Sequence, residues 1–137
     1  MANDVSNLQI DQRASFAGMA FLNCQPRMKF GSDDVQDSTK DGRFKWDVEI
    51  LAGVRNVALN KVENRVFKVG ISSRQDPGEG LNMFEPVELR DFTVGVSEKQ
   101  RRHDNGAKEL TGVSVWFTAS EVVRAAQSAA SSGQAAA

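Results

Sequence analysis

The residue types that most often carry enzyme chemistry are scarce in this sequence. His103 is the only histidine and Cys24 the only cysteine, so no second histidine or cysteine is present to complete a nucleophilic triad or a zinc site. His103 lies in the charged stretch Arg101-Arg102-His103-Asp104, where we expect a solvated loop side chain. Cys24 lies in an apolar segment, where we expect an inert, buried thiol.

Carboxylates are the remaining candidates for catalysis or metal binding. Asp47 and Glu49 share a strand parity with Lys45 and are expected to be surface charges. A calcium-binding loop that began at Asp37 would need a bidentate glutamate at its twelfth position, where the chain has Val48. No phosphate-binding loop of the form GxxxxGKS or GxxxxGKT is present. We therefore predict that the protein is not an enzyme and that it binds no metal or cofactor.

Basic and aromatic residues interleave in two stretches, and this pattern is typical of nucleic-acid binding. Lysine and arginine neutralise phosphates, and an aromatic ring that stacks on a base contributes about 1–3 kcal/mol. The candidate phosphate ligands are Arg43, Lys45, Arg55, Arg65 and Lys68, and the candidate stacking residues are Phe44, Trp46 and Phe67. A second interpretation stays open, in which the cations solvate the outer face of a sheet and Trp46 and Phe67 belong to the core.

Charge is segregated along the chain although the total is close to neutral. The 17 basic and 18 acidic residues give a net charge of −1. Residues 43–74 carry a net charge of +4, whereas residues 31–42 carry −3 and residues 75–91 carry −4. A protein that grips a polyanion needs one cationic surface and not a cationic total. The basic segment contains all eight candidate binding residues.

The elements that position these residues are mostly strands. Alternation of apolar and polar residues predicts five of them, at residues 16–30 (bent near Pro26), 43–50, 64–72, 87–96 and 112–117. A phase slip at Arg90-Asp91 indicates a β-bulge or a sharp bend in the fourth. Thr118 and Glu121 have the spacing of a capping box, which predicts a C-terminal helix that ends near Gly133.

The order of these elements resembles the OB-fold, and within it the single-stranded-DNA-binding proteins of bacteria and their mobile elements. The resemblance rests on the long bent first strand, on Arg43-Phe44-Lys45-Trp46 in the second and on Arg65-Val66-Phe67-Lys68-Val69 in the third. It implies a mostly β, five-stranded antiparallel barrel whose second and third strands face the ligand, with long loops at residues 52–63 and 97–111. The chain departs from the family where the irregular segment 74–86 replaces the expected helix, and where the acidic, phenylalanine-ended C-terminal tip is missing.

These features lead to one function prediction and one alternative. We expect a flexible tail at residues 1–15, an OB-like domain at 16–126 and a low-complexity tail at 127–137. The predicted function is binding of single-stranded DNA, as an accessory factor in replication, recombination or transfer, with replication or recombination proteins as further partners. The resemblance also implies a homo-oligomer. The alternative is a β-rich interaction or assembly subunit of a phage or mobile element that does not bind nucleic acid.

The same composition bears on where the protein works. No apolar run approaches the roughly 20 residues of a membrane span, and the first residues lack the basic and apolar regions of a signal peptide. We therefore expect a cytoplasmic protein that does not interact with membranes.

Overall fold

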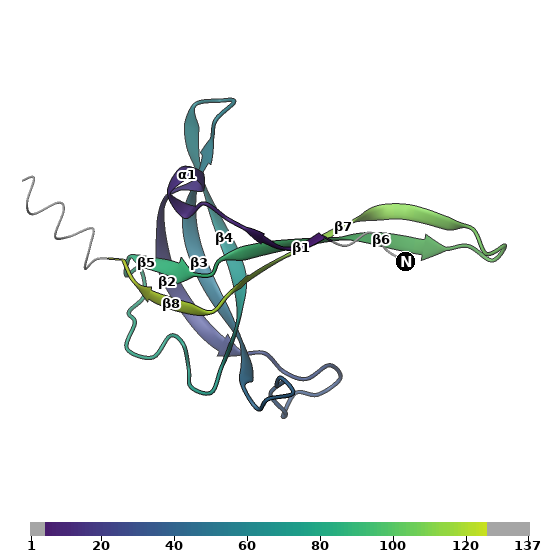
Figure 1. The fold of residues 1–137 in the computed structure, drawn as a ribbon, viewed down its shortest axis with the longest axis horizontal. Helices are drawn as coiled ribbons and strands as arrows, with labels where there is room; N and C mark the ends of the chain where they lie inside the picture. The colour runs from purple at the N-terminus through teal and green to yellow at the C-terminus, as the bar shows by residue number, and fades with distance from the viewer. Residues whose placement is uncertain (1–4, 126–137) are drawn as a thin grey trace, which may run out of the picture.

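Alternating apolar and polar residues fold into long strands, and the computed structural model describes residues 5–125 as a mostly β structure (Figure 1). In chain order the elements are β1 (Val5–Gln9), α1 (Gln12–Ser15), β2 (Phe16–Pro26), β3 (Phe44–Asn56), β4 (Lys61–Ser73), β5 (Val87–Arg90), β6 (Thr93–Arg102), β7 (Lys108–Ala119) and β8 (Glu121–Arg124). Residues 74–86 form no strand or helix, as the sequence predicted. The described part of the chain contains no helix that is long and apolar enough to cross a membrane.

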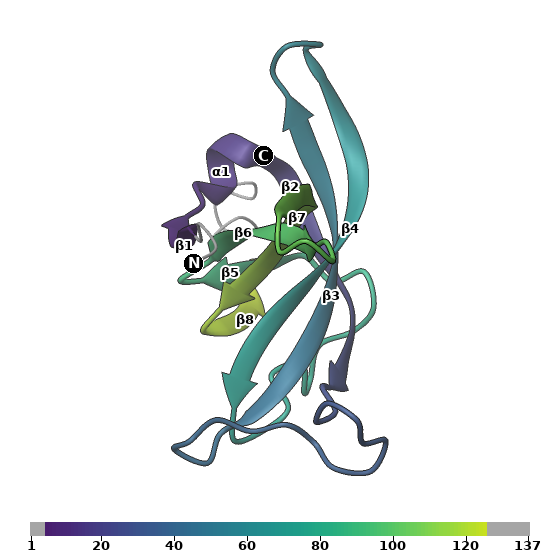
Figure 2. The same cartoon turned by 90° about the vertical axis from the view of Figure 1, so that its right-hand side faces the viewer.

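Six strands form one curled sheet in the order β1-β6-β7-β4-β3-β2, and β5 and β8 form a second, two-stranded sheet. Neighbours in the large sheet are antiparallel except β4 and β7, which run parallel and pair only at residues 69–71 and 117–119. At the edge of β2, Phe21 N donates to Glu85 O at 2.9 Å and Phe84 N donates to Phe21 O at 2.6 Å. The sheet thereby closes into a half-barrel, with β5 and β8 on its inner side (Figure 2).

Alternation along β3 decides which side chains enter the core. Val48, Ile50 and Ala52 are buried, and the residues between them point to the opposite side of the sheet. The antiparallel register places Val48 opposite Val69 and Ile50 opposite Phe67. The core-facing row of β3 thus continues onto β4, and the other row of both strands forms the outer face of the half-barrel.

Four phenylalanines from distant parts of the chain make the centre of the core. Phe67 lies 5.7 Å from Phe16 and 4.9 Å from Phe117, measured between ring centroids. Phe92 completes the cluster, at 6.0 Å from Phe16 and 5.8 Å from Phe117. These separations are in the range of favourable aromatic pairs. Phe67 therefore packs inside the half-barrel, which favours the core interpretation of this residue over a stacking role.

Two hairpins extend beyond the core as arms (Figures 1 and 2). The β3–β4 arm comprises residues 51–66, whose base still contacts the core through Ala52 and Val54, and the β6–β7 arm comprises residues 97–113. Because the parallel strands β4 and β7 pair over only three residues each, the two arms, which both precede these residues in their strands, diverge from the same end of the junction. The resemblance implied long loops at residues 52–63 and 97–111. The structure makes both of them hairpin arms.

The predicted C-terminal helix is wrong within the described residues. Residues 108–119 are strand β7, and residues 121–124 are strand β8, which pairs with β5. The Thr118 hydroxyl lies 2.6 Å from the Thr93 hydroxyl in place of capping a helix, and Val122 is buried in the core. A cap contributes about 1 kcal/mol, which is less than cross-strand pairing together with the burial of a valine. Residues 126–137, where the helix was expected to continue and end, lie outside the described residues.

The predicted count of five strands is also too low. The stretch 87–96 forms two strands, β5 and β6, because Asp91 takes a left-handed backbone conformation (φ 52°) that bends the chain sharply. Residues 5–15, which we expected to be a tail, form β1 and α1. The Gln12 side chain ties them to the core by accepting a hydrogen bond from Leu89 N at 2.9 Å and donating one to Leu89 O.

The buried row of β3 generates a first prediction. Replacing the fully buried Ile50 by alanine should lower the free energy of unfolding by about 2–5 kcal/mol, because the substitution leaves a cavity in the core. Val57→Ala is the control, since Val57 is 87% exposed at the tip of the β3–β4 arm, and it should change stability by less than about 0.5 kcal/mol. Urea unfolding of both variants measures the difference. Equal midpoints would contradict the assignment of this row to the core.

Candidate nucleic-acid interface

Three of the five predicted cations share the outer face of β3 and β4. Lys45 lies opposite Ser72, Lys68 lies opposite Glu49, and Arg55 lies opposite Val62 on the β3–β4 arm. All these residues have the parity opposite to the core row. The outer face also includes two residues of β7, Trp116 and Thr118, since their neighbours Phe117 and Ala119 face the core.

Four of the other five predicted residues, among them the core residue Phe67, do not lie on this face. Arg65 lies opposite Ala52, on the inward side of the β3–β4 arm, and it forms an ion pair with Glu63 at 2.9 Å. The Trp46 ring is half-buried, and its Nε1 donates a hydrogen bond to Ser73 O at 3.0 Å. Phe44 is 42% exposed and pairs with Ser73 at the start of β3, on the inward parity. The predicted set of eight is therefore divided between two sides of the sheet.

A cationic pocket of about 520 Å³ opens beside the short junction of β4 and β7. Its lining includes the three basic side chains of Arg27, Arg43 and Lys45 together with Gly70, Ser72 and Thr118. Gly70 leaves room on the sheet for the Arg27 guanidinium, because a Cβ atom at position 70 would lie 3.1 Å from Arg27 Nη2. The pocket thus joins three predicted residues, Arg43, Lys45 and Trp46, to Arg27, which was not among the predicted residues.

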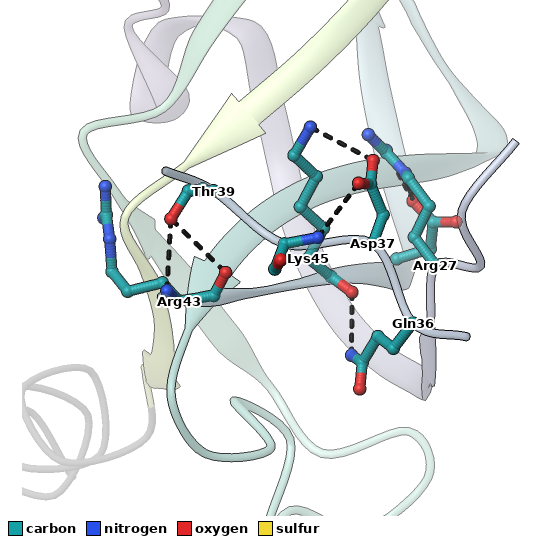
Figure 3. A network of polar contacts seen from close by, with 8 residues as sticks. Arg27, Gln36, Asp37, Thr39, Arg43 and Lys45 are labelled. Carbon is teal, nitrogen blue, oxygen red and sulfur yellow. Dashed lines mark hydrogen bonds and ion pairs between the residues drawn. The ribbon is translucent and has the colours of Figure 1, made fainter. Parts of the chain in front are cut away.

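Each basic side chain of this pocket has a carboxylate partner, and Figure 3 shows Lys45 next to Asp37. Lys45 Nζ lies 3.1 Å from Asp37 Oδ2, and Arg43 Nε lies 3.0 Å from Asp41 Oδ2. The Arg27 guanidinium contacts Asp47 Oδ1 at 2.6 Å. The positive charge of the pocket is therefore balanced by side chains of the same protein.

The electrostatics of two of these carboxylates follow from their hydrogen bonds. The hydrogen bond from Lys45 holds the pKa of Asp37 below its ordinary value. Hydrogen bonds from the Thr39 hydroxyl and from Arg43 lower the pKa of Asp41 to about 2. Both carboxylates are consequently ionised at neutral pH, and they compete with any external anion for the same cations.

The cations that lack such partners are concentrated on the β6–β7 arm. Within residues 5–125, seven of the 17 lysines and arginines form an ion pair with a carboxylate. Among the remaining ten are Lys99, Arg101, Arg102 and Lys108 on this arm, and Lys68 and Arg55 on the outer face. The sequence analysis missed the arm because Glu98, Asp104 and Glu109 reduce its net charge to +1. The dipeptide Arg101-Arg102 is the signal that was available.

Trp116 is the exposed aromatic side chain of the outer face. Its side chain lies flat against the backbone of Gly95, the residue opposite on β6, where a Cβ atom would lie only 2.2–2.5 Å from the indole atoms. The residue remains 39% exposed. Thr118, two residues further along the same face, already lines the cationic pocket. Trp116 was not among the predicted stacking residues.

A second pocket, of about 530 Å³, lies near α1, β2 and β5. Ile10, Phe16, Met19 and Val87 contribute to an apolar lining, and Arg13 is its one basic residue. None of the eight predicted binding residues reaches it. The cationic pocket is therefore the better match to the predicted chemistry.

Two further observations concern metal ligands and the single cysteine. Residues 5–125 contain no cluster of three or more histidine, cysteine or acidic side chains that could hold a metal ion. Burial and a hydrogen bond to Asp76 raise the pKa of the Cys24 thiol to about 12. The thiolate, which is the reactive form, is thus strongly disfavoured at neutral pH.

This shift of the Cys24 pKa generates a prediction. At pH 8 only about one thiol in ten thousand is ionised in the folded protein, so an aromatic disulfide reagent should react far more slowly with it than with the urea-unfolded chain. Because the folded pKa lies above the unfolded one, this thiol stabilises the fold below pH 9, and that contribution is lost as the pH rises toward 12. Absorbance of the aromatic thiol that the reagent releases measures the reaction rates of the folded and of the urea-unfolded protein. Equal rates for the folded and unfolded protein would contradict the predicted environment.

Known proteins provide no counterpart for this geometry. Comparisons of this chain with protein-family models, with curated proteins and with solved structures find no match. The function proposed below therefore rests on the charges, the exposed ring and the strand order described above.

Proposed function

We propose that this protein binds single-stranded DNA, without catalysing a reaction, across the outer face of β3, β4 and β7. The observation that carries the proposal is the presence of Lys45, Lys68 and Trp116 on one face of the curled sheet, next to a cationic pocket. Basic side chains neutralise the phosphates of such a strand, and an exposed ring stacks on its unpaired bases. A single strand suits this face because its bases are free to reach Trp116.

The strand order supports an OB-type framework for this binding. Strands β2, β3 and β4 form a meander, and β6 and β7 form a hairpin whose second strand returns beside β4. This arrangement resembles the five-stranded, partly open Greek-key barrel of OB-folds, in which the second and third strands face the ligand. The corresponding strands here are β3 and β4, which carry Lys45 and Lys68. Strands β1, β5 and β8 are additions to this framework.

The proposed interface differs from the predicted one in its aromatic and basic residues. Phe67 and Trp46 are replaced by Trp116 as the stacking residue, because the first packs in the core and the second faces inward. The four cations of the β6–β7 arm extend the basic surface beyond the sheet, and none of them is held by a carboxylate within the described residues. Several cations that are free to contact phosphates are what a polynucleotide backbone requires.

The alternative, an interaction or assembly subunit, has one observation in its favour. The arms expose aliphatic side chains, including Val62 (50%), Val66 (57%), Val113 (55%) and Val115 (51%). Strand β7 also has an unpaired edge along residues 108–116. Exposed apolar strands with free edges tend to pair with other chains. Such a subunit would self-associate, and an oligonucleotide would not change its hydrodynamic size.

Binding through the outer face predicts a charge-specific effect at Lys68. Wild-type protein should bind poly-dT with an affinity that falls steeply with salt, and Lys68→Glu should weaken binding and reduce the salt slope by about 0.7–1, because one phosphate contact is lost. Arg13→Glu is the matched control, since Arg13 is also exposed and forms no ion pair within the described residues, but it lies on α1, away from this face. Fluorescence anisotropy of labelled poly-dT at several salt concentrations measures both quantities.

Two outcomes of this titration would count against the proposal. No binding of wild-type protein at low salt would overturn the function itself. Equal losses for Lys68→Glu and Arg13→Glu would move the binding away from the outer face. Size-exclusion chromatography of the protein with and without poly-dT addresses the alternative, which predicts self-association and an unchanged elution volume.

Stacking on Trp116 predicts a separate effect on affinity. Trp116→Ala should weaken binding roughly 5- to 150-fold, which corresponds to the loss of one base stack of about 1–3 kcal/mol. Phe44→Ala is the control, because Phe44 has a similar exposure (42%) but the inward parity. The same anisotropy titration measures both variants. A larger loss for Phe44→Ala than for Trp116→Ala would assign the stacking to the originally predicted residue.

A further inference from the structure

The acidic segment 31–42 is folded against the cationic pocket by its own backbone. Asp37 N donates to Arg27 O at 2.8 Å, and Lys45 N donates to Asp37 O at 2.9 Å. Thr39 N donates to Arg43 O at 2.8 Å, and the Gln36 side chain donates to Lys45 O at 2.9 Å. The segment therefore continues the β2–β3 pairing as a short ladder, and its position does not depend on the ion pairs of its side chains.

This ladder places two carboxylates next to two of the residues that are proposed to bind phosphate. Asp37 contacts Lys45, as Figure 3 shows, and Asp41 contacts Arg43. Each carboxylate has a further hydrogen bond that fixes its direction, since Asp37 Oδ1 accepts from Ser38 N at 2.9 Å and Asp41 Oδ1 accepts from the Thr39 hydroxyl. The carboxylates thus occupy the positions around Lys45 and Arg43 that a phosphate of the ligand would take.

We propose that Asp37 and Asp41 are specificity-determining residues that compete internally with phosphate, so that the site selects polynucleotides with many phosphates over short ones. The inference rests on the proposed function and deepens it, because it concerns the same face. A single phosphate gains little by replacing a carboxylate on Lys45, since one anion is exchanged for another. A long strand is first held by cations that have no carboxylate partner within residues 5–125, such as Lys68 and those of the β6–β7 arm.

Once a strand is held there, its remaining phosphates reach Lys45 and Arg43 at a high effective concentration. They then displace the carboxylates, which needs only side-chain movement because the backbone ladder stays in place. The displaced carboxylates attract cations from solution, which offsets part of the counterion release from the nucleic acid. The wild-type protein should therefore show a shallower salt dependence than a protein without these two carboxylates.

The test compares Asp37→Asn/Asp41→Asn with a matched control from the same segment, Asp33→Asn/Asp34→Asn. Both double variants remove two negative charges, but Asp33 and Asp34 form no ion pair within the described residues. Asparagine retains a side-chain oxygen that accepts from Ser38 N, so the local backbone bond is preserved. The single variant Asp37→Asn and a thermal melt of each protein guard against a loss of fold.

Anisotropy titrations with labelled dT5 and dT30 provide the readout. Asp37→Asn/Asp41→Asn should tighten binding of dT5 at least fivefold, tighten binding of dT30 by a smaller factor and steepen the salt slope by about 0.7 per freed cation. Asp33→Asn/Asp34→Asn should change the two affinities by the same small factor.

Three results would overturn the inference, and they are distinguishable. Equal gains for the two double variants would show an effect of net charge alone, and equal affinities for wild type and Asp37→Asn/Asp41→Asn would show no competition; in both cases the proposed function would stand. If neither the wild type nor Asp37→Asn/Asp41→Asn bound dT30 at low salt, the proposed function would fail together with the inference.

Discussion

The parallel pairing of β4 with β7 is the constraint on which the rest of this molecule depends. It joins the β2–β3–β4 meander to the β6–β7 hairpin through only three residue pairs, at 69–71 and 117–119. On the inner side these pairs bring Val69, Ile71 and Phe117 into the shared core. On the outer side they bring Gly70 and Thr118 together at the cationic pocket. One short junction therefore sets the core and the proposed binding face at the same time.

Gly70, which has no Cβ atom, determines which groups can lie on the outer face at this junction. A larger residue at position 70 would meet the Arg27 guanidinium, whose carboxylate partner Asp47 comes from β3. Gly95 has the same role for Trp116 on β6 and β7. In both cases the absence of a Cβ atom lets a large cationic or aromatic group lie flat on the sheet. A face built in this way presents planar groups to a ligand, which suits the stacking of bases and the contact of phosphates.

Local patterns in the sequence predicted the strands well and the contacts between them poorly. The alternation around Trp46, Val48 and Ile50 placed Lys45 on the outer row, because a strand has a period of two and one buried face. The capping box at Thr118–Glu121 failed, because its local contribution was outweighed by pairing with β5, a segment about 30 residues earlier in the chain. Trp116 on Gly95 and Asp37 on Lys45 likewise depend on register and loop path, which no residue pattern in one segment reveals.

For the proposed binding, it matters more whether a cation is paired with a carboxylate than how many cations the segment contains. The segment from 43 to 74 has the highest positive charge in the sequence, yet Arg43, Lys45 and Arg65 within it are held by carboxylates. The β6–β7 arm is almost neutral by count, but its four cations make no ion pair within the described residues. Its acidic residue Glu109 contacts His103 instead of one of these cations. A polyanion would therefore be attracted first to the arm and to Lys68, and it would reach the cationic pocket only by exchange with Asp37 and Asp41. The near-neutral composition of the chain is in this way compatible with a surface that attracts polyanions.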